Sequence, residues 1–177
     1  MNSLNSQLQR INDCDAALCL FCNRQSRHLL IRKAFRLISR LGDGVFWYTL
    51  MAVLLLYYQA YALPAVLHML AVAAVSTVIY KLIKAKTLRP RPFSVYPAII
   101  CTGKALDQFS FPSGHTLHAV SFSLIVVSYF PGLAWLVLPF AVLVALSRPI
   151  LGLHYPSDVL AGALLGALIA AASFRLV

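Results

Sequence analysis

The sequence predicts an all-α integral-membrane protein, a bundle of about five transmembrane helices preceded by an N-terminal interfacial amphipathic helix. Hydrophobic residues make up 60% and charged residues only 11% of the 177 residues, whereas about a quarter of the residues of a soluble domain are charged. The mean hydropathy is +0.79. Uncharged runs long enough to cross a bilayer recur along the chain. We therefore expect a multi-pass integral-membrane protein.

The N-terminal segment, residues 1–43, is expected to lie at the membrane interface. It opens on the polar sequence MNSLNSQLQR, so we expect no cleaved signal peptide. In residues 28–41, HLLIRKAFRLISRL, apolar side chains alternate with arginine and lysine. This pattern favours an amphipathic helix that lies on the bilayer. The alternative is an ordinary solvated basic helix.

The transmembrane core, residues 44–177, completes a single domain. Its first part, residues 44–80, contains no formally charged residue and is long enough for two helices of about 18 residues. Because proline ends or interrupts a helix, we expect these two helices to be divided near Pro64.

A second uncharged run, residues 111–147, predicts another helical hairpin that turns at Pro131. The final span, residues 157–174, is rich in alanine, glycine and leucine. Its glycines at 162 and 166 are four residues apart, and this spacing lets a neighbouring helix pack closely.

Acidic residues are scarce, which limits the chemistry. The chain has only five, all of them aspartate, at positions 13, 15, 43, 107 and 158. Paired-carboxylate glycosidases and two-metal hydrolases need several acids at one place, so we expect neither class. Cys19 and Cys22 form a CxxC pair with no second pair or nearby histidines, and Cys14 adds nothing to it, so we expect no zinc site.

The formal net charge of +10 indicates an anionic partner. In a chain this apolar, a basic excess favours lipid headgroups or a phosphorylated substrate over nucleic acid. The sequence leaves the oligomeric state open.

Three polar groups interrupt the apolar runs, and polar residues at membrane depth are costly. They are KAKTLRPRP at residues 84–92, FPSGH at residues 111–115 and SRPILGLHYPSD at residues 147–158. No predicted membrane helix separates the first group from the second, and two separate the second from the third. All three groups therefore lie on one membrane face. We therefore expect their side chains to converge.

The convergent groups have the chemistry of a phosphate site. Lys84, Arg91 and Arg148 supply positive charge, and the forked guanidinium groups suit phosphate oxygens. Ser113 can cap a helix whose N-terminus, with Gly114 just inside it, offers free backbone N–H groups to an anion. The alternative for FPSGH alone is an ordinary helix start after a proline turn.

Two histidines can carry out phosphoryl transfer without a metal. Asp158 follows His154 by four residues across a proline turn, so its carboxylate can orient one imidazole nitrogen and leave the other facing phosphorus. His154 is therefore the better nucleophile. His115, beside the anion-binding turn and with no acid nearby in sequence, is the better proton donor.

Other polar residues near these motifs have more than one interpretation. Arg89 and Lys104 are read as contacts to lipid headgroups, to a second phosphate or to the interface. Asp107 is read as a cap or turn residue, with a role in leaving-group chemistry or specificity as the alternative. His118, one helical turn after His115, has no partner that the sequence reveals.

The motifs Lys84-x6-Arg91-Pro92, Pro112-Ser113-Gly114-His115 and Ser147-Arg148-x5-His154-x3-Asp158 resemble the three signatures of the type-2 phosphatidic acid phosphatase superfamily, in its integral-membrane branch. Bacterial acid phosphatases and vanadium haloperoxidases are soluble relatives.

The resemblance implies a role for each residue. Lys84, Arg91, Ser113, Gly114 and Arg148 would hold the phosphate. His154 would form a phosphohistidine, Asp158 would orient His154, and His115 would protonate the leaving oxygen. Water would then hydrolyse the intermediate, with no cofactor or divalent metal.

The resemblance also implies a lipid phosphate or pyrophosphate as substrate, with polyprenyl pyrophosphate (such as undecaprenyl pyrophosphate) narrowly ahead of phosphatidic acid and phosphatidylglycerophosphate. Two alternatives remain open, a lipid phosphotransferase and a non-catalytic lipid-phosphate binding or transport protein. Many membrane relatives have six spans, so orientation is also open. The N-terminal basic residues favour a cytoplasmic site, whereas many relatives work on the outer face.

Overall fold

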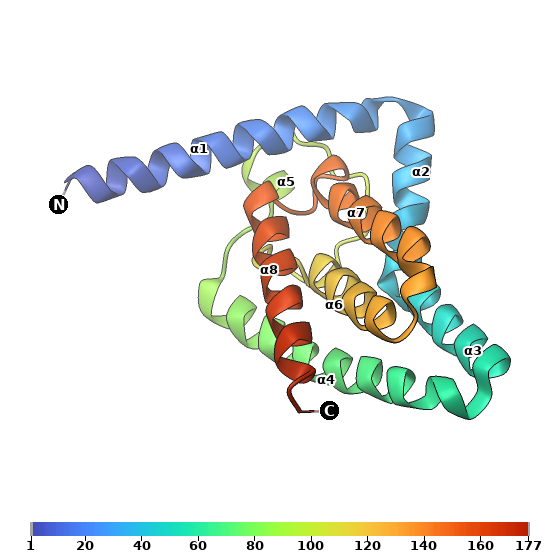
Figure 1. Cartoon of the computed structure of the whole chain (residues 1–177). Helices are drawn as coiled ribbons and strands as arrows, with labels where there is room; N and C mark the ends of the chain where they lie inside the picture. Colours follow the sequence, from blue (N-terminus) through green and yellow to red (C-terminus); the bar gives the residue numbers. More distant parts are fainter. Residues whose placement is uncertain (1, 177) are drawn as a thin grey trace.

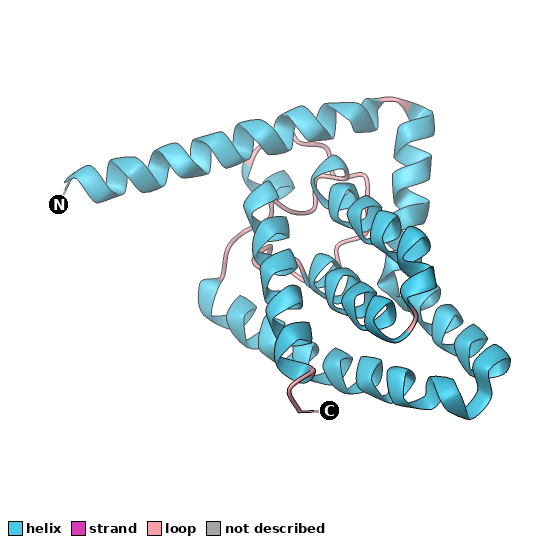
Figure 2. Cartoon of the chain, in the orientation of Figure 1, coloured by secondary structure: helices cyan, strands magenta, loops and turns pink. Residues whose placement is uncertain are grey.

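The computed structural model describes residues 2–176. Within them the regular elements are helices, which loops join (Figure 2). The loops include one isolated β-bridge, between Pro90 and Phe109. The helices are α1 (Asn2–Arg24), α2 (Leu29–Arg40), α3 (Phe46–Tyr58), α4 (Leu63–Thr87), α5 (Pro92–Val95), α6 (Gly114–Tyr129), α7 (Ala134–Ile150) and α8 (Pro156–Ser173) (Figure 1). Short helical turns join several of them, namely η1 (Gln25–Arg27), η2 (Leu41–Val45), η3 (Gln59–Ala62) and η4 (Pro131–Leu133). The predicted all-α class is confirmed.

Three stretches within residues 2–176 are long and apolar enough to cross a membrane: Leu29–Thr87, Pro131–Ile150 and Pro156–Ser173. The first contains α2, α3 and α4, which follow one another through η2 and η3. The chain reverses at η3, and Pro64 stands in the first turn of α4, where its missing N–H costs no hydrogen bond. The second predicted turn is η4, which begins at Pro131.

Helix α6 occupies the middle of the bundle and packs against α4, α7 and α8 (Figure 1). A cluster of buried apolar side chains holds these helices and α3 together, and Trp47, Met69, Ile125 and Val137 are among its most buried members. The core therefore surrounds α6, the helix that begins with the second motif.

Glycines bring α6 and α8 into close contact, as their spacing predicted. A Cβ atom added to Gly162 would lie 2.5 Å from the carbonyl oxygen of Ser113, and one added to Gly166 would collide with the carbonyl oxygen of Leu117. The backbones of the two helices thus touch at two successive turns. Since Ser113 is the first of these contacts, this packing also fixes the start of α6.

The N-terminal segment differs from the prediction. The sequence indicated no helix before residue 28, yet α1 extends over 23 residues and reaches across one end of the bundle (Figure 1). Helix α1 is attached by a small apolar cluster, in which its Ala16, Cys19 and Leu20 pack near Ile99 and Tyr155, and by polar contacts. Helix α2, the predicted amphipathic helix, packs against α7 and continues through η2 toward α3.

Candidate active site

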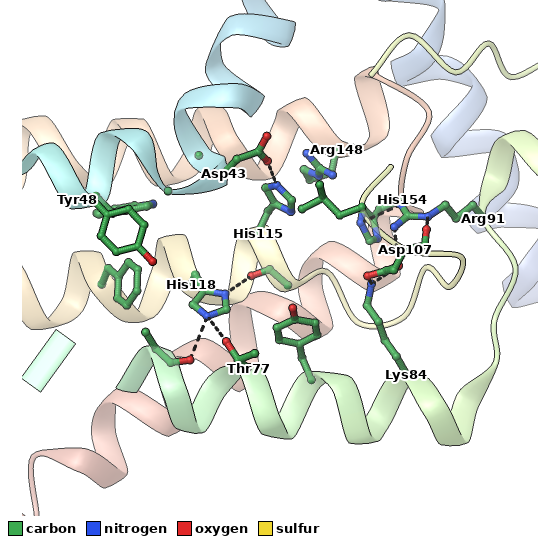
Figure 3. Close-up of a pocket in the computed structure, with 18 residues that line it drawn as sticks. Asp43, Tyr48, Thr77, Lys84, Arg91, Asp107, His115, His118, Arg148 and His154 are labelled. Carbon is green, nitrogen blue, oxygen red and sulfur yellow. Dashed lines mark hydrogen bonds and ion pairs between the residues drawn. The ribbon is translucent and has the colours of Figure 1, made fainter. Parts of the chain in front are cut away.

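The three polar motifs meet in one cavity of about 240 Å³ (Figure 3). The C-terminal end of α4, the start of α6, the end of α7 and the loop before α8 each contribute to its wall. Six of the predicted site residues line it: Lys84, Arg91, Gly114, His115, Arg148 and His154. The other two, Ser113 and Asp158, are fully buried behind the wall.

Lys84 and Arg91, from the first motif, both bind Asp107. The Lys84 Nζ donates to the two carboxylate oxygens of Asp107 at 2.9 and 2.8 Å, and Arg91 Nη2 donates to Oδ1 at 2.8 Å. Burial would raise the pKa of Asp107, but its hydrogen bond and ion pair with Lys84, together with Arg91, outweigh this and lower it. Of the two interpretations of Asp107, a cap or turn residue and a residue that bears on the chemistry, the structure favours the second, because its carboxylate bridges two cations of the cavity.

Ser113 begins α6 as the second motif predicted. Its Oγ accepts a hydrogen bond from the backbone N–H of Thr116, and its own N–H donates to the carbonyl oxygen of Asp158 at 3.0 Å. Gly114 and His115 follow in the first turn and line the cavity. The motif therefore presents a helix N-terminus to the cavity, with its positive dipole end nearby.

His115 has a carboxylate partner that sequence reasoning missed. Its Nε2 contacts Oδ1 of Asp43, which lies in η2, and both residues line the cavity (Figure 3). Gly44, the next residue, has a φ of 133°, a backbone conformation that glycine adopts readily. Asp43 is 72 residues from His115 in sequence. Its appearance in a short Gly-Asp-Gly break between apolar helices is the only signal that could have indicated it.

His154 lies in the loop between α7 and α8 and is 1% exposed. Its Nε2 is 3.4 Å from Arg91 Nη1, on the cavity side. Burial, and then the charges of Arg148, Arg91 and Lys84, lower the pKa of this imidazole well below its ordinary value. The ring is therefore neutral at pH 7, which a nucleophilic nitrogen requires.

The carboxylate of Asp158 is near His154 but does not hydrogen-bond to it in this structure. Its Oδ2 is 3.6 Å from His154 Nδ1, and it accepts instead from the backbone N–H of Tyr155 at 2.9 Å. Its Oδ1 accepts from Arg89 Nη1 at 2.6 Å. Arg89, which was expected to face lipid headgroups or the interface, is thus bound inside the protein.

Arg148 is the most deeply buried cation of the site, with 1% of its surface exposed. Its Nη1 donates to Ser39 of α2 at 2.6 Å, while its Nε has no hydrogen-bond partner among the described residues. A buried guanidinium with an unsatisfied donor is costly unless an anion completes its hydrogen bonds. Arg148 therefore favours an anionic ligand in the cavity.

The opposite end of the cavity is less polar. Tyr48 of α3 lies there (Figure 3), and the rings of Trp47 and Phe122, which contact each other, also line the cavity. His118 lies between the two ends, where its Nδ1 is 2.8 Å from the carbonyl oxygen of Gly114 and its Nε2 is 3.4 Å from Thr77 Oγ1. Since a carbonyl oxygen only accepts, His118 donates through Nδ1. Cations at one end and aromatic rings at the other suit an amphipathic phosphate.

A membrane helical bundle that directs two histidines and three cations into one cavity belongs to the class of membrane lipid phosphatases. Residues 65–177 match the PAP2 superfamily, and the chain belongs to this superfamily, in its membrane lipid phosphatase branch. The predicted resemblance is confirmed.

Curated relatives from this branch act on lipid phosphates. The chain is 31% identical over 141 residues to an undecaprenyl-diphosphatase of Sulfolobus acidocaldarius, covering 78% of this chain and 67% of that protein. It is 40% identical over 101 residues to the decaprenylphosphoryl-5-phosphoribose phosphatase of Mycobacterium tuberculosis, covering 56% of this chain and 54% of that one. The chain thus spans only about half the length of the second relative.

Two solved structures share the fold. The transmembrane PAP2-type phosphatidylglycerolphosphate phosphatase of Bacillus subtilis superimposes with a TM-score of 0.75 at 25% identity, covering 94% of this chain and 86% of that one. LpxE of Aquifex aeolicus superimposes with a TM-score of 0.77 at 25% identity, covering 90% and 93%. At these coverages both likenesses include residues that precede the family region, residues 65–177.

Proposed function

We propose that the protein hydrolyses a phosphomonoester or pyrophosphate of a membrane lipid through a phosphohistidine intermediate. One observation supports this above the others: the two histidines and the three cations named by the motifs line a single cavity (Figure 3). The low pKa of His154 supports its role as nucleophile.

In this mechanism the phosphate lies among Lys84, Arg91 and Arg148, where it competes with Asp107 for the first two. Ser113 and Gly114 present the N-terminus of α6 to it. His154 attacks phosphorus through Nε2, the nitrogen on the Arg91 side, and the bond from phosphorus to the leaving oxygen breaks.

His115 gives its proton to that leaving oxygen. Asp158 stabilises the charged His154 ring after a small approach from 3.6 Å. A water molecule, activated by His115 in its neutral form, then attacks phosphorus. Phosphate leaves, and both imidazoles return to their starting forms. The chain's own residues supply every group that these steps need, without a divalent metal.

The substrate we propose first is a polyprenyl pyrophosphate, followed by phosphatidic acid and phosphatidylglycerophosphate. The two curated relatives named above are prenyl-lipid phosphatases, which supports the first choice. The Bacillus subtilis enzyme acts on phosphatidylglycerolphosphate, which keeps the glycerolipids in consideration. The aromatic end of the cavity would hold the first carbons of the tail.

We also propose how the chain crosses the membrane. Helices α3, α4, α6, α7 and α8 would form five spans of a single domain, residues 1–177, in a bacterial cytoplasmic membrane. The basic helix α2 would lie near the headgroups at the end that carries the site, because Arg36 and Ser39 bind residues there.

The test uses the purified full-length chain in detergent with EDTA. Phosphate release is measured from a prenyl pyrophosphate, phosphatidic acid and phosphatidylglycerophosphate, and catalytic efficiency ranks them. We expect release that His154→Ala abolishes and His115→Ala reduces by about a hundredfold or more. Equal release by wild type and His154→Ala would exclude the mechanism. Label transferred from the donor to another lipid would indicate a phosphotransferase, and substrate binding without turnover would indicate a binding protein.

A further inference from the structure

Helix α1 contacts the loop of the third motif through a buried carboxylate. Asp15 is 6% exposed, and its Oδ1 accepts a hydrogen bond from the backbone N–H of Ser157 at 3.0 Å. Its Oδ2 accepts from the hydroxyl of Ser157 and, at 2.7 Å, from Arg89 Nη2. An aspartate of the N-terminal helix thus binds the first turn of α8.

Arg89 joins this carboxylate to the one that faces the nucleophile. Its Nη2 binds Asp15, while its Nη1 binds Asp158 Oδ1 at 2.6 Å and Ser157 Oγ at 2.7 Å. The guanidinium also stacks on the ring of Tyr155, with its central carbon 4.1 Å from the ring centroid. Both planar ends of Arg89 are therefore occupied, one by each aspartate, and its position is fixed.

Two further α1 side chains hold the backbone before His154 and at His154 itself. The amide of Asn23 donates to the carbonyl oxygens of Ile150 and Ile100, at 3.0 Å each, and accepts from the N–H of Ile100 at 2.9 Å. The thiol of Cys19 is 3.6 Å from the carbonyl oxygen of His154 itself. Helix α1 therefore fixes the nucleophile's loop at its start, its middle and its end.

We infer that Asp15 is a positioning residue that acts through Arg89 on Asp158 and, through Asp158, on His154. Asp15 does not line the cavity, and it precedes residues 65–177 that match the family. Asp158 is fully buried, and beyond the Tyr155 N–H its strongest partner is Arg89. Without Asp15, the guanidinium loses the carboxylate that fixes it, and Asp158 is free to turn away from His154 Nδ1. This inference rests on the proposed function, since it assigns a cause to the alignment of the proposed nucleophile.

The experiment compares Asp15→Asn, Asp15→Glu and Asp13→Asn in the full-length protein. Asp13 is an exposed aspartate of the same helix and serves as the matched control. We expect Asp15→Asn to lower kcat by about ten- to a hundredfold, because small displacements of a reacting group are costly. KM should change less than about twofold, Asp15→Glu should recover part of kcat, and Asp13→Asn should match wild type. In an Arg89→Gln background, Asp15→Asn should have little further effect.

A merely structural role predicts a different pattern. If Asp15→Asn lowers kcat, binding of inorganic phosphate and thermal stability together, or if it adds its full effect to Arg89→Gln, the inference is overturned. Nuclear magnetic resonance of ¹⁵N-labelled histidine gives a readout that does not need turnover. The His154 signal, assigned with His154→Ala, should shift in Asp15→Asn and stay in place in Asp13→Asn. An inactive wild type would reject the proposed function, and an unshifted signal would separately reject the positioning role.

Discussion

The imidazole of His154 is buried among positive charges. It is 1% exposed, and Arg91 is 3.4 Å away on the cavity side. Burial and the three neighbouring cations both disfavour the protonated ring, so its pKa falls well below the ordinary value of 6.5. The site therefore keeps its proposed nucleophile neutral under mildly acidic conditions, where an exposed histidine would be protonated.

This environment predicts the pH dependence of the reaction. Attack requires neutral His154, so the acidic limb of kcat/KM should lie at the lowered pKa of His154, below pH 6.5. Removing the charge of Arg148 should raise that pKa, and the acidic limb of kcat/KM should move to higher pH in Arg148→Gln. Both profiles are measured with one substrate, so ionisation of the substrate cancels in the comparison. A limb that stays in place would contradict the assignment of His154.

Asp43 and Asp107 place negative charge in the same cavity. Asp107 bridges Lys84 and Arg91, and Asp43 contacts the Nε2 of His115. In the absence of substrate, the carboxylates satisfy cations that would otherwise be desolvated without a partner. Arg148 is different, because its Nε has no partner among the described residues. We therefore expect Arg148, more than Lys84 or Arg91, to gain hydrogen bonds when a phosphate binds.

At the scale of elements, the contact between α6 and α8 determines the geometry of the second and third motifs. Gly162 faces the Ser113 carbonyl and Gly166 faces the Leu117 carbonyl without room for a side chain. The N–H of Ser113 also donates to the Asp158 carbonyl, so the first turns of the two helices are directly bonded. A change in this contact would displace both motifs.

We predict that Gly162→Ala and Gly166→Ala each lower the free energy of unfolding by about 1–3 kcal/mol, because a methyl group would force the two backbones apart. Gly162→Ala should also lower kcat, since it displaces Ser113 at the start of α6. Gly132→Ala is the control, because a Cβ atom there meets nothing within 4 Å. Thermal unfolding in detergent and phosphate release measure the two effects. Equal stability of Gly162→Ala and Gly132→Ala would contradict the close packing.

The elements also show what a sequence can predict. Helix breaks at proline and the glycine contact of α8 were predicted, because each depends on residues close together in sequence. The N-terminal helix α1 was missed, because only a short apolar patch around Ala16 and Cys19 packs on the rest of the protein, and polar contacts of Asp15 and Asn23 complete the attachment. Polar contacts between distant segments leave no periodic pattern to detect.

The same reasoning applies to the site. The motifs indicated the residues that the structure brings to the cavity, and their catalytic roles stay predictions. Asp43 was missed because its partner lies 72 residues away, and Arg89 was misplaced because its partners Asp15 and Asp158 lie 74 and 69 residues away. Asp43 and Arg89 are single charged side chains, and the residues that they bind come close only in the folded chain.

For the whole molecule, a bound anion should stabilise the folded state. Ligand that binds only the folded protein adds about 2.7 kcal/mol to the free energy of unfolding at a hundred times its Kd. We expect inorganic phosphate to raise the Tm of wild type and of His154→Ala, and to have little effect on Arg148→Gln. Arg175→Gln, exposed near the end of the chain, should behave as wild type. A phosphate-independent Tm in wild type would contradict an anion site in this cavity.

The backbone contact between α6 and α8 has a consequence for how a lipid would reach the histidines. His115 lies in the first turn of one of these helices and His154 lies two residues before the other, so we expect the two imidazoles to keep their separation when a ligand binds. The two carboxylates of the cavity lie instead on η2, with Gly44 at a φ of 133°, and on the loop that carries Asp107, and we expect any rearrangement to occur there. We therefore expect an arriving phosphate to replace the carboxylates of Asp43 and Asp107 in their contacts with His115, Lys84 and Arg91, while α6 and α8 stay in place.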